Sequence, residues 1–291
     1  MNQTQKNVSL LLLLSVLLLG SIAGYQRHHF YDGKLHVIFC SVGQGDAILI
    51  QSPDHKYLMV DSGPDRTVLD CLARHMPFWQ RQINLMILTH PHADHFFGLF
   101  YLLKQYQIEE FATEALRNDT SSFTEVMRLL SSKKVPQRYV LNGDNWWVGQ
   151  VRLEVMYPTQ EYLDNASPNG LIGETKELAS VMTNISYGNF DILLTGDSQT
   201  EAMKQALAYL PGEIDVLQSP HHGSQTGVDA EVVAAIHPQL AVISVGAHNR
   251  YGHPHKKVLQ IYQDQNIPVL RTDQHGDIEI VSDGNGWEVK K

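Results

Sequence analysis

The chain begins with one long apolar run and continues as short apolar segments separated by polar loops. From residue 35 onward, segments of four to seven residues rich in β-branched and apolar side chains predict strands. We expect strands at Leu35–Cys40, Ala47–Gln51, Tyr57–Val60, Ile83–Leu88, Val151–Met156, Val181–Tyr187, Phe190–Thr195, Ile214–Gln218 and Leu240–Val245.

Apolar residues at helical spacing predict helices among these strands. We expect them at Phe96–Tyr106, Thr120–Ser131, Thr200–Leu210, Ala230–Ile236 and Lys256–Gln265. Strands in two blocks, with helices in both, predict a layered α/β sandwich. Neither a repeat nor a Pro-rich linker interrupts the sequence from 35 to 289, so we expect one domain over residues 33–289.

Residues 1–24 have the features of an export signal. Lys6 precedes the apolar run Val8–Leu19, and the small-residue segment Gly20–Gly24 follows it. This order is typical of a secretory signal peptide, here with a cut after Ala23. An uncleaved anchor through residues 8–23 is the alternative. Either way, we expect the protein to be secreted or held on the extracellular face of the cell membrane.

Four of the predicted strands lead into His or Asp residues. They are Ile83–Leu88 before His90, Phe190–Thr195 before Asp197, Ile214–Gln218 before His221 and His222, and Leu240–Val245 before the segment Asn249–His253. Ligands in sheet-based folds gather at the carboxyl ends of strands, where rigid elements present side chains to a shared crevice. The pattern therefore predicts a common site at these strand ends.

The run from His90 to His95 offers three imidazoles and one carboxylate within six residues. Such ligands suit Zn²⁺, Mn²⁺ or Fe. In an extended stretch, residues two apart point the same way, so His90 and His92 can hold one ion. Asp94 and His95 then face a second ion. Two ions need an anionic bridge, and Asp197 after the apolar Leu193-Leu194 is the candidate.

Composition limits the possible partners. The chain has 31 acidic and 22 basic residues, a formal charge of −9, which argues against a general nucleic-acid binder. A nuclease is not excluded, because bound metal can supply the positive charge. The two cysteines, Cys40 and Cys71, form no disulfide framework, and the sequence does not decide whether they pair.

The His90–His95 run resembles the His-x-His-x-Asp-His signature of the metallo-β-lactamase fold superfamily. Further segments, in the same order, resemble the extracellular hydrolase domain of the ComEC-type competence proteins. They are Val42–Ile50, Val60–Gly63, Thr89–His95, Tyr187–Phe190 with Leu193–Asp197, Pro220–Ser224 and Asn249–Pro254. The resemblance covers residues 35 to 285 and implies an αββα four-layer sandwich with the metals at its rim.

The resemblance also implies two divalent metal ions, Zn or Mn. His90 and His92 would hold the first, Asp94 and His95 the second, with Asp197 between them. One histidine of the His221-His222 pair would complete the second site. We favour His222, because adjacent residues at a strand end point in opposite directions and His221 would then face the substrate. The residues assigned to catalysis are Asp94, His221 and His253.

Other residues of the matching segments would support the centre. Asp61 either orients a ligand imidazole or closes an Asx-type turn before Gly63. His253 would contact phosphate or protonate the leaving group. Arg250 contacts substrate or forms a structural ion pair, and Ser224 caps a segment or closes a turn. Asp46 and Asn249 would lie behind the ligands or bind substrate.

Three departures from the resemblance concern the site. No histidine lies between residues 96 and 189, where many superfamily members have a further ligand, so the first ion would be held weakly. Ser41 replaces the usual Asp, and Phe97 interrupts the usual Gly-Gly. We expect both substitutions near the cleft. The chain also lacks the many membrane helices of the competence channel, so we expect that it does not itself translocate DNA.

The leading functional hypothesis is metal-assisted hydrolysis of a phosphodiester outside the cytoplasm, with DNA as the substrate that the resemblance suggests. A cell-wall or choline-phosphate diester is the alternative substrate, and a β-lactam is a third. A catalytically silent surface binding module is the alternative of another class. The sequence predicts no protein partner.

Overall fold

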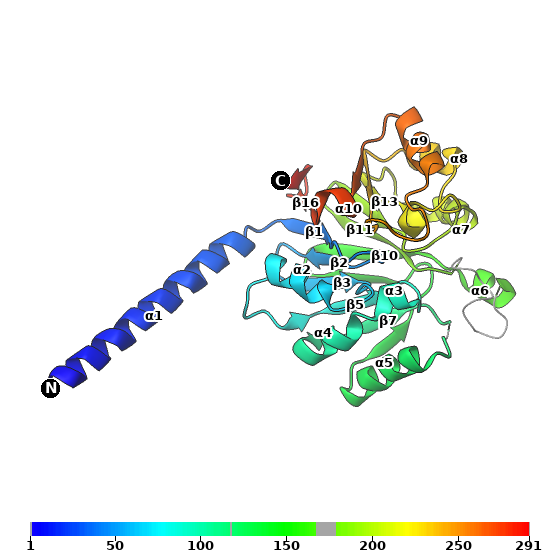
Figure 1. The fold of residues 1–291 in the computed structure, drawn as a ribbon. Helices are drawn as coiled ribbons and strands as arrows, with labels where there is room; N and C mark the ends of the chain where they lie inside the picture. Colours follow the sequence, from blue (N-terminus) through cyan, green and yellow to red (C-terminus); the bar gives the residue numbers. More distant parts are fainter. Residues whose placement is uncertain (1, 117, 167–178, 291) are drawn as a thin grey trace.

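Two mixed β-sheets lie face to face at the centre of the fold, which the computed structural model describes for residues 2–116, 118–166 and 179–290 (Figure 1). The first sheet has the order β17 (Trp287–Lys290), β16 (Ile278–Ser282), β1 (Leu35–Phe39), β2 (Ile48–Gln51), β3 (Tyr57–Val60), β5 (Leu85–Leu88), β7 (Phe111–Thr113) and β8 (Gln137–Tyr139). The second has the order β15 (Val269–Arg271), β14 (Leu240–Ile243), β13 (Val216–Gln218), β12 (Phe190–Leu194), β11 (Met182–Tyr187), β10 (Val151–Tyr157) and β9 (Asn145–Val148). Strands β4 (Gln82–Ile83) and β6 (Gln107–Ile108) form a separate pair.

Alternate residues of the strands divide between two cores. In β1, Leu35 and Phe39 pack between the sheets, whereas Ile38 packs on the outer face. In β5, Leu85 and Ile87 face inward and Met86 faces outward. Both faces of these strands are therefore covered, which explains why the sequence there is apolar without alternation.

Helices complete the two outer layers (Figure 1). Residues of α2 (Thr67–His75), α4 (Leu99–Gln105) and α5 (Ser121–Ser132) pack on the first sheet, and residues of α7 (Thr200–Ala206), α8 (Ala230–Ile236) and α9 (Lys256–Asp264) pack on the second. Short helices α6 (Gln160–Ala166), α10 (Thr272–His275), η1 (Leu207–Tyr209) and η2 (Pro220–Gly223) lie in connections. The predicted αββα sandwich is confirmed.

One predicted helix is wrong in extent. The segment expected as a single helix, Phe96–Tyr106, is split into α3 (Ala93–Phe96) and α4. Gly98 lies at the break, and its amide donates a hydrogen bond to the Gly63 carbonyl at 2.9 Å. A Cβ there would lie 1.8 Å from the Ser62 carbonyl oxygen, so the backbone fits only with glycine. Helix α2 was not predicted at all.

Parallel strands of both sheets end at one rim of the sandwich. In the first sheet β3, β5, β7 and β8 run parallel, and in the second β12, β13, β14 and β15 run parallel. The strand ends singled out in the sequence belong to these two sets. The fold thus supplies the shared rim that the strand-end pattern predicts.

Helix α1 (Gln3–Phe30) projects away from the sandwich (Figure 1). It is long and apolar enough to cross a membrane, and an 18-residue window within it has a mean hydropathy of 2.3. A signal sequence has the same properties. The helix continues past the expected end of the segment at residue 24 and reaches the domain at Phe30, whose carbonyl accepts a hydrogen bond from Gln51.

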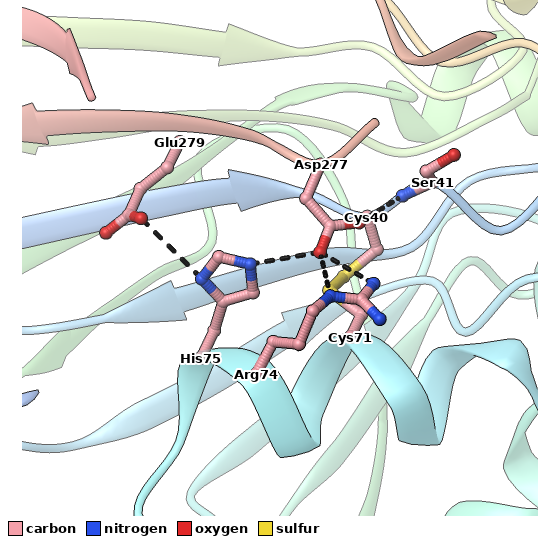
Figure 2. Close-up of a disulfide and its surroundings, with 7 residues drawn as sticks. All are labelled: Cys40, Ser41, Cys71, Arg74, His75, Asp277 and Glu279. Carbon is pink, nitrogen blue, oxygen red and sulfur yellow. Dashed lines mark hydrogen bonds and ion pairs between the residues drawn. A yellow bond between two sulfur atoms is a disulfide. The ribbon is translucent and has the colours of Figure 1, made fainter. Parts of the chain in front are cut away.

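A disulfide between Cys40 and Cys71 joins the end of β1 to α2 (Figure 2). Both cysteines are buried. Beside it, Asp277 accepts hydrogen bonds from the Ser41 amide at 2.8 Å and from Arg74 at 2.8 Å, and it contacts His75 at 3.0 Å. Burial acts to raise the pKa of Asp277, but these three partners outweigh it and lower the pKa to about 2. The start of the loop after β1 is therefore fixed both by the disulfide at Cys40 and by the hydrogen bond of Asp277 to the Ser41 amide.

Candidate metal centre

A buried cluster of Asp94, His95, Asp197 and His222 lies at the rim, with ligand atoms within 4.8 Å of one another. The Nε2 atoms of His95 and His222 lie 3.3 and 3.4 Å from Oδ1 of Asp197. The Nε2 atom of His222 is also 3.7 Å from Oδ2 of Asp94. Residues from the ends of two sheets thus converge on one point.

The other oxygen of Asp197 faces a second group of imidazoles. The Nε2 atom of His90 lies 3.8 Å from Oδ2 of Asp197, and the Nε2 atom of His221 lies 3.5 Å from the same oxygen. The ring of His92 packs edge-on against that of His90, with 4.5 Å between centroids. Asp197 therefore presents one oxygen to each of two groups of donors, which is the arrangement expected of a bridging carboxylate.

The expectation that His221 and His222 point in opposite directions is wrong. They do not extend from the strand but lie in η2, with φ of 51° and 55°. In this left-handed turn both imidazoles approach Asp197, one at each carboxylate oxygen. Strand geometry does not apply to this pair, because the backbone turns sharply directly after Pro220.

Glycine permits the close approach of the Asp197 loop. Gly196 follows β12 with φ of +51°. A Cβ there would lie 2.5 Å from Ser180 Oγ and 2.8 Å from Thr89 Oγ1. The Ser180 hydroxyl in turn accepts a hydrogen bond from the Asp197 amide at 3.2 Å. The backbone that carries the bridging candidate is thus packed directly against the segment that carries His90.

Hydrogen bonds behind the cluster orient its imidazoles. Asp61 contacts Nδ1 of His95 at 2.7 Å and accepts hydrogen bonds from the amide and hydroxyl of Thr89, each at 2.8 Å. The Nδ1 atom of His222 contacts the Ser244 carbonyl at 3.0 Å. When Nδ1 carries the proton, the Nε2 lone pair of each ring faces the cluster. Asp61 therefore has the contacts of an orienting residue, and it also has the positive φ, 58°, of a turn residue.

Asp46 is buried beside the same histidines. One oxygen lies 3.6 Å from Nδ1 of His222, and the other accepts a hydrogen bond from Gln218 at 2.8 Å. Burial raises the pKa of Asp46 to about 6, against the opposing effect of His222 and His95. For Asp197, burial also acts to raise the pKa, but His222 and His95 outweigh it and hold the pKa well below its usual value.

The inward-facing atoms of the cluster fit a metal. Four buried atoms have no hydrogen-bond partner among the described residues. They are Nε2 of His90, His95 and His222, and Oδ1 of Asp197. Unpartnered buried polar atoms are expensive, and several that face one point are explained by a cation that they would share. Imidazole and carboxylate donors without thiolate match the predicted Zn or Mn.

Of the remaining predicted residues, Asn249 and Arg250 line a cavity beside the cluster. This cavity, of about 500 Å³ beside Asp94, is lined by Phe97, Arg250 and Tyr251, among others. The exposed guanidinium of Arg250 contacts the Tyr251 hydroxyl at 2.8 Å and lies over its ring. No salt bridge to Arg250 is found among the described residues, which leaves its charge available to the cavity.

His253, Asn249 and Ser224 organise the surrounding loops. The His253 ring lies 5.7 Å from that of His221, and burial, with His222 and His221 nearby, lowers its pKa to about 4. Asn249 accepts a hydrogen bond from the His253 amide at 3.0 Å and donates to its carbonyl at 2.6 Å. Ser224 contacts Thr226 at 3.1 Å. Asn249 thus holds the loop that carries His253, and Ser224 has a turn residue's contacts.

The two substitutions expected near the cleft differ in position. Phe97 lines the cavity beside Asp94. Ser41 lines a separate cavity with Arg74, His75 and Asp277. Its amide is turned toward Asp277 instead.

Two residues of the site were missed. Thr89 links Asp61 to the His90 segment, and the Gln218 side chain bonds Asp46 and accepts hydrogen bonds from the amides of Thr195 and Gly196. Thr89 directly precedes His90, and Gln218 is the last residue of the strand that leads to His221 and His222, so their positions at strand ends were the available signal.

The sequence and fold both match known proteins. Residues 40–136 match the family model described as Metallo-beta-lactamase superfamily. ComE operon protein 3 of Bacillus subtilis is 28% identical over 266 residues, covering 85% of this chain and 33% of that protein. Recombination protein 2 of Haemophilus influenzae is 26% identical, covering 82% and 28%. The chain thus spans about a third of the length of these relatives.

Among solved structures, the metallo-β-lactamase fold protein YhfI from Bacillus subtilis is similar with a TM-score of 0.56 and 13% identity, covering 84% of this chain and 99% of that one. Residues 40–136 thus match the superfamily's model, and the domain has the metallo-β-lactamase fold. The chain is also distantly homologous to Competence protein ComA of Neisseria gonorrhoeae, which is 24% identical over 272 residues, covering 91% of this chain and 35% of that protein.

Proposed function

We propose that this protein is a metal-dependent phosphodiesterase that acts outside the cytoplasm. The observation that carries the proposal is the Asp197 carboxylate, which has His95 and His222 at one oxygen and His90 and His221 at the other. A structural zinc site closes around one ion with four ligands, whereas a carboxylate shared between two groups of donors fits a two-metal hydrolase.

In the assignment we propose, Asp94, His95, His222 and Asp197 hold one ion. His90, His92, His221 and Asp197 hold the other. His221 would then take the place of the histidine that the chain lacks between residues 96 and 189. When bound, such ions lower the pKa of water and stabilise the negative charge that develops on a phosphoryl group.

The chain's own groups position the reactants. Asp61 and the Ser244 carbonyl hold the rings of His95 and His222 in the orientation that turns Nε2 toward the centre. Burial lowers the pKa of His253, which favours the neutral imidazole at pH 7, and its ring lies beside that of His221. A neutral imidazole there can hydrogen-bond a phosphate or leaving-group oxygen.

The cavity beside Asp94 favours an anionic substrate. Arg250 contributes a fixed cation to it, while Phe97 and Tyr251 contribute apolar and aromatic surface. A phosphodiester with an aromatic substituent, such as a nucleotide, matches both features. The cation opposes the trimethylammonium group of a choline ester. The similarity to Competence protein ComA supports DNA as the natural substrate.

The test is a substrate panel with the purified, metal-loaded protein. We expect hydrolysis of bis-p-nitrophenyl phosphate and single-stranded DNA to exceed that of p-nitrophenyl phosphorylcholine and of a β-lactam. Asp197→Asn keeps the side-chain shape but removes the bridging charge, and we expect it to lower kcat/KM at least about 100-fold. Undiminished activity of this variant would refute the bridging role, and inactivity of the wild type on every ester would refute the proposed function.

A further inference from the structure

The connection between α2 and β4, residues 76–81, carries an exposed aromatic pair. Phe78 is 56% exposed and Trp79 is 40% exposed, and their rings meet edge to face with centroids 5.0 Å apart. Such a pair is usually buried in a core, because exposing it leaves apolar area in water. We refer to residues 76–81 as the aromatic loop.

The aromatic loop contacts α1 directly. The Phe78 amide donates a hydrogen bond to Oε1 of Gln26 at 3.0 Å. In Figure 1 this loop and the root of α1 lie on the same side of the domain. Gln26 is partly covered, whereas the apolar residues of α1 before it are exposed. The aromatic loop therefore lies beside residue 26 of α1.

If α1 spans a bilayer, the position of Gln26 along the helix corresponds to the membrane–water interface. The apolar part of α1 ends near Ala23, and Tyr25, Gln26 and Arg27 follow. At 1.5 Å per residue, Gln26 lies about 5 Å beyond the hydrocarbon edge. Each headgroup layer is about 5–8 Å thick. Trp and Tyr are enriched at this depth, because their rings combine an apolar body with a polar group.

The charge beside the aromatic loop supports a lipid partner. The adjoining cavity is lined by Trp79, Arg81, Lys104 and Lys133 together with neutral residues, and none of the described residues that line it is a carboxylate. This local excess of cations contrasts with the chain's formal charge of −9. Cations beside an exposed aromatic pair fit the surface of an anionic bilayer, where each contributes about fivefold to affinity.

We propose that the aromatic loop is a second membrane contact. Phe78 and Trp79 enter the headgroup layer of the bilayer that α1 spans, and Arg81 and Lys104 face anionic lipid headgroups. The domain is then fixed against the membrane at two points rather than tethered by α1 alone. The proposal requires α1 to be retained as an anchor, and it is independent of the catalytic assignment.

The test uses the full chain reconstituted into phosphatidylcholine–phosphatidylglycerol vesicles whose acyl chains carry bromine, which quenches nearby tryptophan. We expect tryptophan emission to fall relative to unbrominated vesicles, and Trp79→Phe to remove most of that quenching. Trp147→Phe is the matched control, because Trp147 is 67% exposed on β9 in the second sheet. We expect it to leave the quenching unchanged.

A second variant tests the mechanism while keeping the probe. Phe78→Ser retains Trp79, and we expect it to reduce the quenching at least about twofold. Replacing phosphatidylglycerol with phosphatidylcholine should also reduce it, because Arg81 and Lys104 lose their anionic partners. Quenching that is absent in the wild type, or that survives Trp79→Phe, overturns the proposal. Because no outcome depends on phosphodiester hydrolysis, the two proposals fail separately.

Discussion

His221 and His222 differ in which oxygen of Asp197 they approach, and this predicts separable defects. His222→Asn should remove the ion held with Asp94 and His95, and His221→Asn should remove the ion held with His90. Asparagine tolerates the left-handed backbone of both positions, so each change removes an imidazole without adding strain. We expect each variant to bind about one metal equivalent fewer, measured by mass spectrometry of metal content, and to lose activity about 100-fold or more.

The matched control for this pair is His237→Asn. His237 is an exposed residue with φ of 45° at the end of α8, so it shares the backbone conformation but not the site. We expect its metal content and activity to match the wild type. Should His221→Asn retain the full metal content, His221 would revert to a substrate-facing role.

The disulfide between β1 and α2 is predicted to stabilise the fold and the loop that follows it. It closes a loop with a sequence separation of 31 residues, which corresponds to roughly 3–4 kcal/mol in the chain-entropy account. We expect the double variant Cys40→Ala, Cys71→Ala to melt about 10 °C lower by calorimetry. Wild-type protein reduced by a dithiol should melt at a similarly lowered temperature.

The double variant provides the control, since its melting temperature should not respond to the dithiol. If reduction leaves the wild-type melting temperature unchanged, the disulfide does not stabilise the native state. Because Cys40 directly precedes the loop that carries Gln44 and Asp46, we expect reduction also to lower activity more than the change in folded fraction explains.

The sequence predicted elements best where burial dictates the residue pattern. The apolar runs of β5 and β12 are covered on both faces, and their positions and the ligands after them could be predicted. Helix α2 was not predicted although its buried residues Val68, Cys71 and Leu72 lie at helical spacing, so the apolar pattern was present in the sequence. The pairing of Cys40 with Cys71 depends on how α2 docks beside β1, and no local pattern encodes that contact.

The candidate site was predictable as a set of residues but not as a geometry. The spacing within His90–His95 was enough to assign His90 and His92 to one ion and Asp94 and His95 to the other, without information from the rest of the chain. The orientation of the His221-His222 pair depended on a left-handed turn after Pro220, which a strand-based argument cannot supply. The support from Thr89 and Gln218 depended on contacts between segments far apart in sequence.

The site lies where the two sheets meet, and metal should therefore stabilise the whole domain. Asp94 and His95 follow the first sheet's β5, whereas Asp197 and His222 follow β12 and β13 of the second. An ion held by all four side chains would connect the two halves, and it would bind the folded state only. At a free metal concentration of about 100 times Kd, such binding stabilises by about 2.7 kcal/mol.

We therefore expect chelation to lower the melting temperature by roughly 5–10 °C, with recovery on adding Zn²⁺ or Mn²⁺, as measured by scanning calorimetry. Asp197→Asn should melt at the same temperature with and without metal, because both groups of donors lose their shared carboxylate. His237→Asn should respond to metal as the wild type does. A wild-type melting temperature that is unaffected by both chelator and metal would show that the cluster is held by its own hydrogen bonds, and the unpartnered Nε2 atoms would then need another explanation.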